Sequence, residues 1–194
     1  MENLKKSYAV TNTKGSVGKT PISLSLAFDL GLNIQTNDLS ALLLCYKEET
    51  KLVDTLQWEE NIVYDMGGFV AEKVIGIISQ VEKVIVPVND DPSSLIHTIS
   101  CLNQFKDKAK NEIIIIITKT ESKTEYEKVK KYIDKKFPNN HFKYFELPST
   151  KAFKHSLKYG KSIKYLVENN KRHNNWFSDY VRNYYEPILE EIKK

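Results

Sequence analysis

The residues whose types and spacing can do chemistry are concentrated at positions 14–20, which read KGSVGKT. This stretch follows a strand-like run and opens a helical one, which is the context of a phosphate-binding loop. Without side chains at Gly15 and Gly18, successive backbone N–H groups can converge on phosphate oxygens at a helix N-terminus, which itself favours an anion. Lys19 is suited to the β- and γ-phosphates, and the Thr20 hydroxyl is suited to Mg²⁺. The alternative is a simple Gly-containing turn.

Lys14 narrows the class of phosphate-binding loop. With it, the stretch resembles the deviant Walker A motif, KGGxGK[ST], of the ParA/MinD family of ATPases. In that family the extra lysine reaches across a nucleotide-sandwich dimer to the partner's bound phosphates, where a cation supplied in trans offsets the charge that builds up during transfer. The alternative for Lys14 is local electrostatic support of its own loop. The resemblance implies a P-loop NTPase fold, ATP and Mg²⁺ as ligands, and a homodimer that forms on ATP.

The resemblance extends to the exit of the second expected strand. Where the family has an aspartate-x-aspartate pair, residues 36–38 read TND, so Thr36 replaces the first acid and Asp38 keeps the second. Family precedent implies that Asp38 positions or activates the attacking water near Mg²⁺. A second role, which does not exclude the first, is to cap a helix that begins near Leu39.

A third stretch, residues 62–68, reads IVYDMGG and resembles a Walker B strand followed by a nucleotide-sensing switch. Asp65 would hold Mg²⁺ through water, because Mg²⁺ retains several of its waters. Gly67 and Gly68 would let the backbone rearrange with the γ-phosphate. A simple turn after a strand is the alternative, but the order of this stretch and its distance from the phosphate loop disfavour it.

The resemblance also implies where the base of the nucleotide lies. In the family the loop after the last strand contacts adenine, and the strand exit at 118–120 is a weaker candidate; the sequence carries no adenine-specific signature. The expected catalytic residues are Lys14, Lys19 and Asp38, and the expected magnesium ligands are Thr20, Asp38 and Asp65. The expected nucleotide-binding residues are Lys14, Gly15, Ser16, Val17, Gly18, Lys19, Thr20, Pro21, Pro148, Ser149 and Thr150.

Three features depart from the family pattern. Ser16 replaces a common glycine, and Pro21 stands where the family usually has a second Ser or Thr. Proline is sterically acceptable in the first turn of a helix, but it removes an N–H and a hydroxyl that would serve the α-phosphate. The spacing between Asp38 and Asp65 is also shorter than in typical members. We therefore expect a compact or partly degenerate member with weakened nucleotide affinity.

The elements that must position these residues alternate between apolar β-rich runs and segments of helical period. Several strand candidates are continuously apolar, which is typical of strands covered on both faces. The alternation predicts an α/β fold with a mostly parallel twisted sheet and helices on both faces. Strands are expected at 8–11, 32–36, 62–64, 84–88, 113–118 and 142–147, and helices at 19–30, 39–56, 70–80, 93–108 and 123–137.

From about residue 150 the pattern becomes helical, with Gly160 as a break. The polar side of the segment 176–192 mixes acids with few cations, which favours packing against the core over attachment to a membrane. Because the chain shows no repeat and no linker, residues 1–194 are predicted to form a single P-loop ATPase domain with a basic helical C-terminal part. The apolar face of segment 176–192 consists of Phe177, Tyr180, Val181, Tyr184, Ile188 and Ile192.

The composition is that of an ordinary globular protein, with 194 residues, of which 41% are hydrophobic and 28% charged. Its longest run of aliphatic residues, 113–117, is far too short to span a membrane, and the N-terminus shows no secretory signal. Two cysteines, Cys45 and Cys101, exclude a disulfide scaffold and a four-cysteine metal site. We therefore predict a cytoplasmic protein with no membrane partner, associated with the nucleoid if it binds DNA.

Charge is divided unevenly, since residues 1–97 carry a net −5 and residues 98–194 a net +9. A basic half is typical of proteins with a polyanionic partner, although a solvated lysine-rich surface gives the same pattern. ParA-type proteins bind DNA non-specifically through basic C-terminal residues, a mode that depends steeply on salt. Four lysines at three- and four-residue steps would share one helix face. The candidate DNA-binding residues are Lys151, Lys154, Lys158, Lys161, Arg172 and Arg182.

These features together predict a ParA-like, Mg²⁺-dependent ATPase that dimerises on ATP, binds DNA non-specifically and acts in plasmid or chromosome partition. A centromere-binding or other partner protein is expected to stimulate a slow basal hydrolysis. Three alternatives stay open: a nucleotide-gated binding module with little or no hydrolysis, another ParA/MinD-family ATPase with a MinD-like positioning role, and a small-molecule ligase that shares this phosphate loop. Phosphate release measured with and without DNA and partner separates the binding module from the enzyme.

Overall fold

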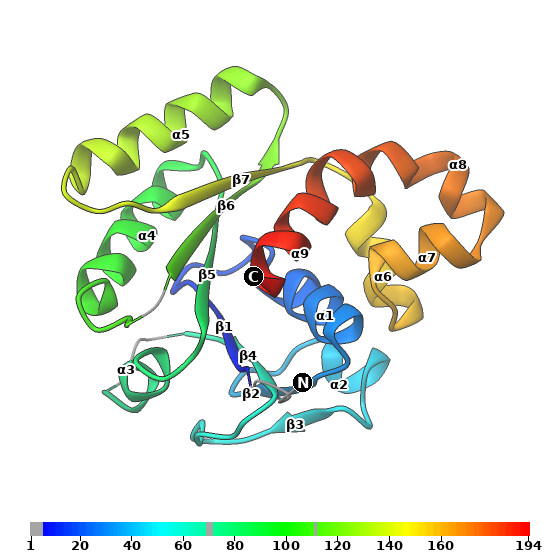
Figure 1. The fold of residues 1–194 in the computed structure, drawn as a ribbon, viewed down its shortest axis with the longest axis horizontal. Coiled ribbons are helices and arrows are strands. Elements are labelled where there is room, and N and C mark those ends of the chain that lie inside the picture. The colour runs from blue at the N-terminus through cyan, green and yellow to red at the C-terminus, as the bar shows by residue number, and fades with distance from the viewer. Residues whose placement is uncertain (1–5, 69–71, 111) are drawn as a thin grey trace.

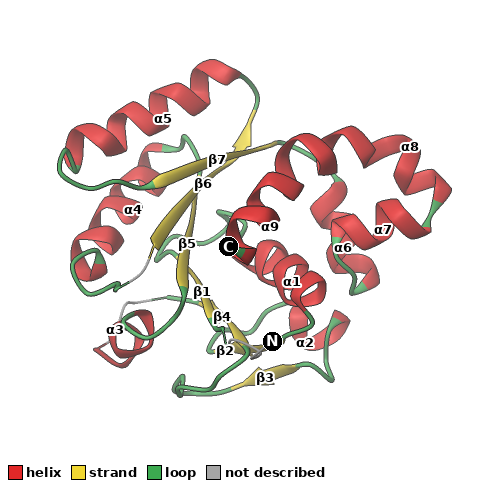
Figure 2. Cartoon of the chain, in the orientation of Figure 1, coloured by secondary structure: helices red, strands yellow, loops and turns green. Residues whose placement is uncertain are grey.

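The computed structural model describes residues 6–68, 72–110 and 112–194. Over these residues the chain forms a seven-stranded sheet in the order β3-β2-β4-β1-β5-β6-β7, and all neighbouring strands are parallel (Figure 2). The strands are β1 (Tyr8–Thr11), β2 (Asn33–Thr36), β3 (Thr50–Leu52), β4 (Ile62–Met66), β5 (Lys83–Val88), β6 (Glu112–Thr120) and β7 (Lys143–Pro148).

Helices cover both faces of the sheet, as Figure 1 shows. On one face α3 (Glu72–Ile78), α4 (Pro92–Phe105) and α5 (Lys123–Lys136) bury their apolar side chains against the strands. This arrangement confirms the predicted α/β fold with helices on both faces. On the other face lie α1 (Lys19–Leu30), α2 (Leu42–Cys45), α6 (Ala152–Tyr159), α7 (Ile163–Asn169), α8 (Lys171–Tyr180), a π-helical turn η1 (Val181–Tyr185) and α9 (Glu186–Lys193).

The five consecutive isoleucines of β6 show why this sheet needs two apolar faces. Side chains of Ile113, Ile115 and Ile117 join the core beneath α3, α4 and α5, whereas Ile114 and Ile116 join the core beneath α1 and α9. Successive residues of a strand point to opposite faces, so a strand covered on both sides is continuously apolar. The interpretation of this run as a strand covered on both faces is confirmed.

The helix predicted at 39–56 is wrong. Only α2 and the edge strand β3 form there, and Thr50 pairs with Ile34 of β2. Leu42 is buried but Leu44 is 89% exposed, so the consecutive leucines do not present one helical face to the core. The other expected elements differ from the structure by a few residues at their ends, and residues 70 and 71 of the helix expected at 70–80 lie outside the described residues.

The expected break at Gly160 is confirmed, because this residue ends α6 in the left-handed conformation with φ 61°. A Cβ atom at Gly160 would lie 1.9 Å from the carbonyl oxygen of Cys45, so α6 approaches the end of α2 too closely for any side chain. Lys161 therefore lies beyond α6, and Lys151 lies at its N-cap. The expectation that the four lysines share one helix face is wrong for these two residues.

The C-terminal segment packs against the second face of the sheet, as predicted. Although η1 interrupts the α-helical pattern, the run from α8 to α9 is continuously helical. Its end is fixed to the sheet by Lys83 of β5, whose Nζ donates to the Glu191 carbonyl oxygen at 2.6 Å. Within the described ranges, no helix is long and apolar enough to span a membrane. The buried residues of the expected apolar face are Val181, Ile188 and Ile192, and Phe177, Tyr180 and Tyr184 are half-buried.

Candidate nucleotide-binding site

The loop 14–18 joins β1 to α1, and Asn12 fixes the point where it begins. This asparagine is fully buried, and its Nδ2 donates to the Pro87 carbonyl oxygen at 2.8 Å and to Thr98 Oγ1 at 2.7 Å. Its Oδ1 accepts a hydrogen bond from the Lys14 backbone N–H at 2.9 Å. The start of the loop is thereby tied to the end of β5 and to α4. The sequence reasoning missed Asn12, and its place between the strand and the loop was the available signal.

The exit of β6 holds the other side of the loop. Thr118 Oγ1 donates to the Val17 carbonyl oxygen at 2.9 Å, and Lys119 Nζ donates to the Ser16 carbonyl oxygen at 2.6 Å. Ser16 and Gly18 both have positive φ, 63° and 98°, so the loop turns through the left-handed region twice. A left-handed residue is easiest for glycine, which explains Gly18 and the family preference for glycine at position 16. The loop is thus pre-shaped from both sides.

Lys19 begins α1 and directs its ammonium group back into the loop. Its Nζ donates to the Lys14 carbonyl oxygen at 2.9 Å. Burial lowers the pKa of Lys19, and the carboxylates of Asp65 and Asp38 oppose this shift. A lysine that is half-buried, close to two acids and bonded to a loop carbonyl can exchange that bond for a phosphate oxygen.

Asp65 lies near the C-terminal end of β4 and is 3% exposed. Its Oδ2 accepts a hydrogen bond from Thr20 Oγ1 at 3.2 Å, and its Oδ1 accepts one from Ser23 Oγ at 2.9 Å. Burial raises the pKa of Asp65, although both hydroxyls and Lys19 favour the ionised form. A buried carboxylate beside a hydroxyl is a suitable donor set for a hard cation such as Mg²⁺. Ser23, one helical turn after Lys19, was not predicted.

Asn37 joins the loops that follow β2 and β4. Its Oδ1 accepts from the Gly67 N–H at 2.9 Å, and its Nδ2 donates to the Gly67 carbonyl oxygen at 3.3 Å. The two loops are so close that a Cβ atom at Gly67 would lie 2.4 Å from Asp38 Cβ. Helix α2 begins at Leu42 with Ala41 at its N-cap, so the capping role considered for Asp38 is wrong. Asn37 was also missed by the sequence reasoning.

A cavity of about 330 Å³ lies among these groups, where the exits of β1, β2, β4 and β6 meet. Its oxygen-rich lining and two lysines match what phosphates and Mg²⁺ need, and Gly15 leaves its wall open where a side chain would stand. Of the expected phosphate-loop residues, Val17 is buried and does not line the cavity, nor does the half-buried Lys14. The lining residues are Gly15, Ser16, Gly18, Lys19, Thr20, Pro21, Asp38, Asp65, Gly67 and Lys119.

A smaller and more apolar slot of about 90 Å³ shares Gly18, Pro21 and Lys119 with this cavity. It contains two of the three residues expected to contact adenine, Pro148 and Thr150. Ser149 does not line it; its backbone N–H donates to the Thr120 carbonyl oxygen at 2.9 Å. The remaining lining residues are Ile22, Thr118, Leu147 and Phe153. The slot therefore adjoins the phosphate cavity on the side toward α6.

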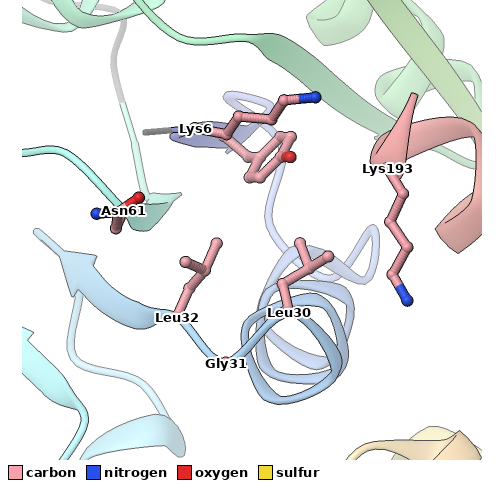
Figure 3. A pocket seen from close by; sticks show the side chains of 7 residues that line it. Lys6, Leu30, Gly31, Leu32, Asn61 and Lys193 are labelled. Carbon is pink, nitrogen blue, oxygen red and sulfur yellow. The ribbon is translucent and has the colours of Figure 1, made fainter. Parts of the chain in front are cut away.

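The larger cavity of about 460 Å³ in Figure 3 contains none of the expected site residues. It lies between the ends of α1 and α9 and the start of β1, where Lys6 and Lys193 flank Leu30 and Leu32. Strands of a parallel sheet bind ligands beyond their carboxyl ends, and this cavity is at the opposite ends. Position and chemistry, rather than volume, identify the phosphate cavity as the candidate site.

The candidate DNA-binding residues are all exposed but do not form one row. Lys154 and Lys158 lie on α6. Lys161 Nζ lies 5.0 Å from the centre of the Phe28 ring, the Arg172 guanidinium lies 4.3 Å from the centre of the Trp176 ring, and Arg182 pairs with Asp179 at 3.7 Å. Arg172 lies on α8, Arg182 lies on η1, which contacts β7, and Lys151 and Lys161 lie just outside the two ends of α6.

The fold has counterparts among solved structures. Apo McdA from Cyanothece is similar with a TM-score of 0.68 at 12% identity, over 97% of this chain and 98% of that chain. A ParA-family ATPase from Chlorobium tepidum has a TM-score of 0.59 at 12% identity, over 86% of this chain and 93% of that chain. MinD from Pyrococcus horikoshii, complexed with Mg-ADP, has a TM-score of 0.57 at 12% identity, over 87% of this chain and 91% of that chain. No protein-family model and no curated protein matches the sequence. The chain has the P-loop NTPase fold of the ParA/MinD ATPases, as its motifs predicted.

Proposed function

We propose that this protein is a Mg²⁺-dependent ATPase that dimerises on ATP and binds DNA non-specifically, in the manner of ParA-like partition proteins. The single observation that carries the proposal is the cavity at the exits of β1, β2 and β4, where the phosphate loop, Asp38 and Asp65 meet. Solved structures with a similar fold are ATPases, and the MinD structure from Pyrococcus horikoshii is a complex with Mg-ADP. Two acids, two lysines and a glycine-rich loop that converge on one cavity at the carboxyl ends of parallel strands are typical of a ligand site.

The charged and hydroxyl side chains in and beside the cavity have distinct roles in the proposed activity. Bound Mg²⁺ would neutralise charge on the phosphates, and Thr20 and Asp65 would hold it, with Ser23 orienting the Asp65 carboxylate. Lys19 would leave the Lys14 carbonyl and bind the β- and γ-phosphates. Asp38 would orient a water for in-line attack on the γ-phosphate.

Lys14 and the apolar slot complete the proposed site. Lys14 does not line its own cavity, which is consistent with a role at the phosphates of a second subunit. The base would enter the slot between Pro21 and Pro148, whose rings offer apolar contacts. Because Pro21 lacks an N–H for the α-phosphate, we expect nucleotide affinity below that of loops with Ser or Thr at this place.

Calorimetry with ATP and Mg²⁺ tests the site, and light scattering with a slowly hydrolysed ATP analogue tests the dimer. We expect Lys14→Ala to bind nucleotide but stay monomeric, and Asp38→Ala to bind and dimerise without releasing phosphate. No uptake of ATP by the folded wild-type protein would overturn the proposal. Nucleotide binding with no phosphate release from the wild type, even with DNA, would instead identify a nucleotide-gated binding module.

DNA binding is tested separately, with random duplex at several salt concentrations. The double variant Lys154→Glu, Lys158→Glu should weaken binding and flatten the salt dependence, because two phosphate contacts are lost. Lys128→Glu, Lys131→Glu on α5 makes the same change of charge on another exposed helix and is the matched control. Equal effects of the two double variants would show that net charge alone, and not the surface of α6, governs binding.

A further inference from the structure

An exposed aromatic surface lies between α6 and α8, away from the phosphate cavity. At its centre His155 Nδ1 lies 3.0 Å from His173 Nε2, so the two imidazoles share a hydrogen bond. Tyr159 and Trp176 flank this pair, with ring centres 5.4 Å and 6.2 Å from that of His173. They are 48% and 49% exposed. We call these four rings the α6–α8 aromatic patch.

Cations lie over both exposed rings of the patch. The Arg172 guanidinium is 4.3 Å from the centre of the Trp176 ring, and Lys158 Nζ is 5.4 Å from the centre of the Tyr159 ring. Acidic residues of this part of the chain have partners elsewhere: Glu168 lies 3.7 Å from Lys164 and Asp179 lies 3.7 Å from Arg182. The patch therefore combines exposed aromatic rings with positive charge.

We propose that the α6–α8 aromatic patch binds single-stranded nucleic acid, with unpaired bases stacking on the Arg172–Trp176 pair and on Tyr159. Aromatic rings and guanidinium planes are the surfaces on which unpaired bases stack, and nearby lysines bind the phosphates between them. This inference rests on the DNA-binding part of the proposed function and names the form of nucleic acid that this surface prefers.

Duplex DNA is expected to bind this aromatic surface less tightly than single-stranded nucleic acid does. In a duplex the flat faces of the bases are already covered by their neighbours, so an exposed ring reaches only phosphates and sugars. A surface of lysines alone would make no such distinction, because counterion release depends on charge rather than on bases. The two exposed rings are therefore what separates this inference from general affinity for DNA.

Fluorescence of Trp176 reports binding directly. The chain has two tryptophans, so a Trp58→Phe background leaves Trp176 as the single emitter. The probe is an oligothymidine of about 16 nucleotides, compared with a duplex of the same length. We expect the oligothymidine to quench Trp176 and to bind more tightly than the duplex at equal salt.

Affinity measured with a labelled probe then separates stacking from charge. Trp176→Ala should weaken oligothymidine binding by about 5- to 100-fold, with a smaller effect on duplex, and Trp176→Phe should restore most of the loss because it keeps a stacking face. Tyr132→Ala on α5 is the matched control, since that ring is 38% exposed and has Lys136 Nζ 5.8 Å from its centre. It should leave the affinity unchanged.

Every other outcome overturns the inference in an identifiable way. Duplex binding without preferential binding of oligothymidine leaves the DNA-binding part of the proposed function standing and removes this inference, and binding of neither removes both. If Trp176→Ala and Tyr132→Ala behave alike, the patch is not the stacking surface. If vesicles of phosphatidylserine and phosphatidylcholine, but no oligonucleotide, change the Trp176 emission, the patch faces a membrane instead.

Discussion

Gly67 offers the sharpest test of how the loops around the cavity fit together. Replacing it with alanine would place a Cβ atom 2.4 Å from Asp38 Cβ and 2.6 Å from Asp38 Oδ2. Ordinary contacts of such atoms are about 3.4 Å or longer, so the two loops must separate by about 1 Å. Separation also strains the paired hydrogen bonds between Asn37 and Gly67.

The expected loss of stability follows from these contacts. Overpacking a well-filled site costs about 1–3 kcal/mol, and weakening a hydrogen bond costs about 0.5–1.5 kcal/mol. We therefore expect Gly67→Ala to lower the free energy of unfolding by about 2–3 kcal/mol. Because Asp38 is the residue displaced, phosphate release should fall steeply while ATP still binds to the unaltered loop at 14–20.

Urea unfolding and phosphate release measure the two effects on the same preparations. Gly76→Ala is the matched control, since Gly76 lies within α3 and a Cβ atom there meets nothing within 4 Å. This control should raise stability by about 1 kcal/mol, the helix propensity gained over glycine, and leave hydrolysis unchanged. If Gly67→Ala unfolds and hydrolyses ATP like the wild type, the loops are not held together as described.

Three further predictions concern stability. Gly31→Ala and Gly160→Ala both place alanine in a left-handed helix cap, at φ 66° and 61°, and this strain should lower the free energy of unfolding by about 1 kcal/mol in each variant. Gly160→Ala should lower it by at least about 2 kcal/mol more, because its Cβ clashes with the Cys45 carbonyl, and equal losses in urea unfolding would contradict this packing. Asp65→Asn should stabilise the nucleotide-free fold in urea unfolding, since burial raises the pKa of this carboxyl, and should abolish Mg²⁺-dependent ATP binding in calorimetry; a less stable variant would refute the first part. Burial lowers the pKa of His173 from its usual 6.5, so below about pH 6.5 the unfolded chain takes up a proton that the folded chain does not. The free energy of unfolding should therefore decrease as the pH is lowered below this value, and it should decrease less in His173→Gln.

The phosphate loop and the central strands could be predicted from the sequence because local residue types determine them. A loop that wraps phosphates needs small residues and a lysine at fixed spacing, and a strand covered on both faces needs an unbroken apolar run such as 113–117. Neither requirement depends on distant parts of the chain.

Asn37 and Ser23 could not be predicted in the same way, because each bonds to a group far along the chain, and neither could the long-range partners of Asn12. Asn12 bonds to Pro87 and Asn37 to Gly67, and these partners meet only once the strand order is known. The false helix at 39–56 has a related cause. Its leucines satisfy helix propensity locally, but pairing with β2 decides the conformation of residues 50–52.

Helix α1 physically connects the candidate nucleotide site with the basic C-terminal helices. Its first turns carry Lys19 and Ser23, which face the cavity and Asp65. Its later turns carry Ser25, whose Oγ lies 3.3 Å from Ser156 Oγ of α6, and Asp29, whose carboxylate accepts hydrogen bonds from Ser162 and Tyr185. A helix is stiff along its axis, so a shift of the N-terminus of α1 would either move α6 and α7 with it or break these hydrogen bonds. If the proposed nucleotide shifts α1 when it binds, the same contacts would pass that shift on to the surface proposed to bind nucleic acid.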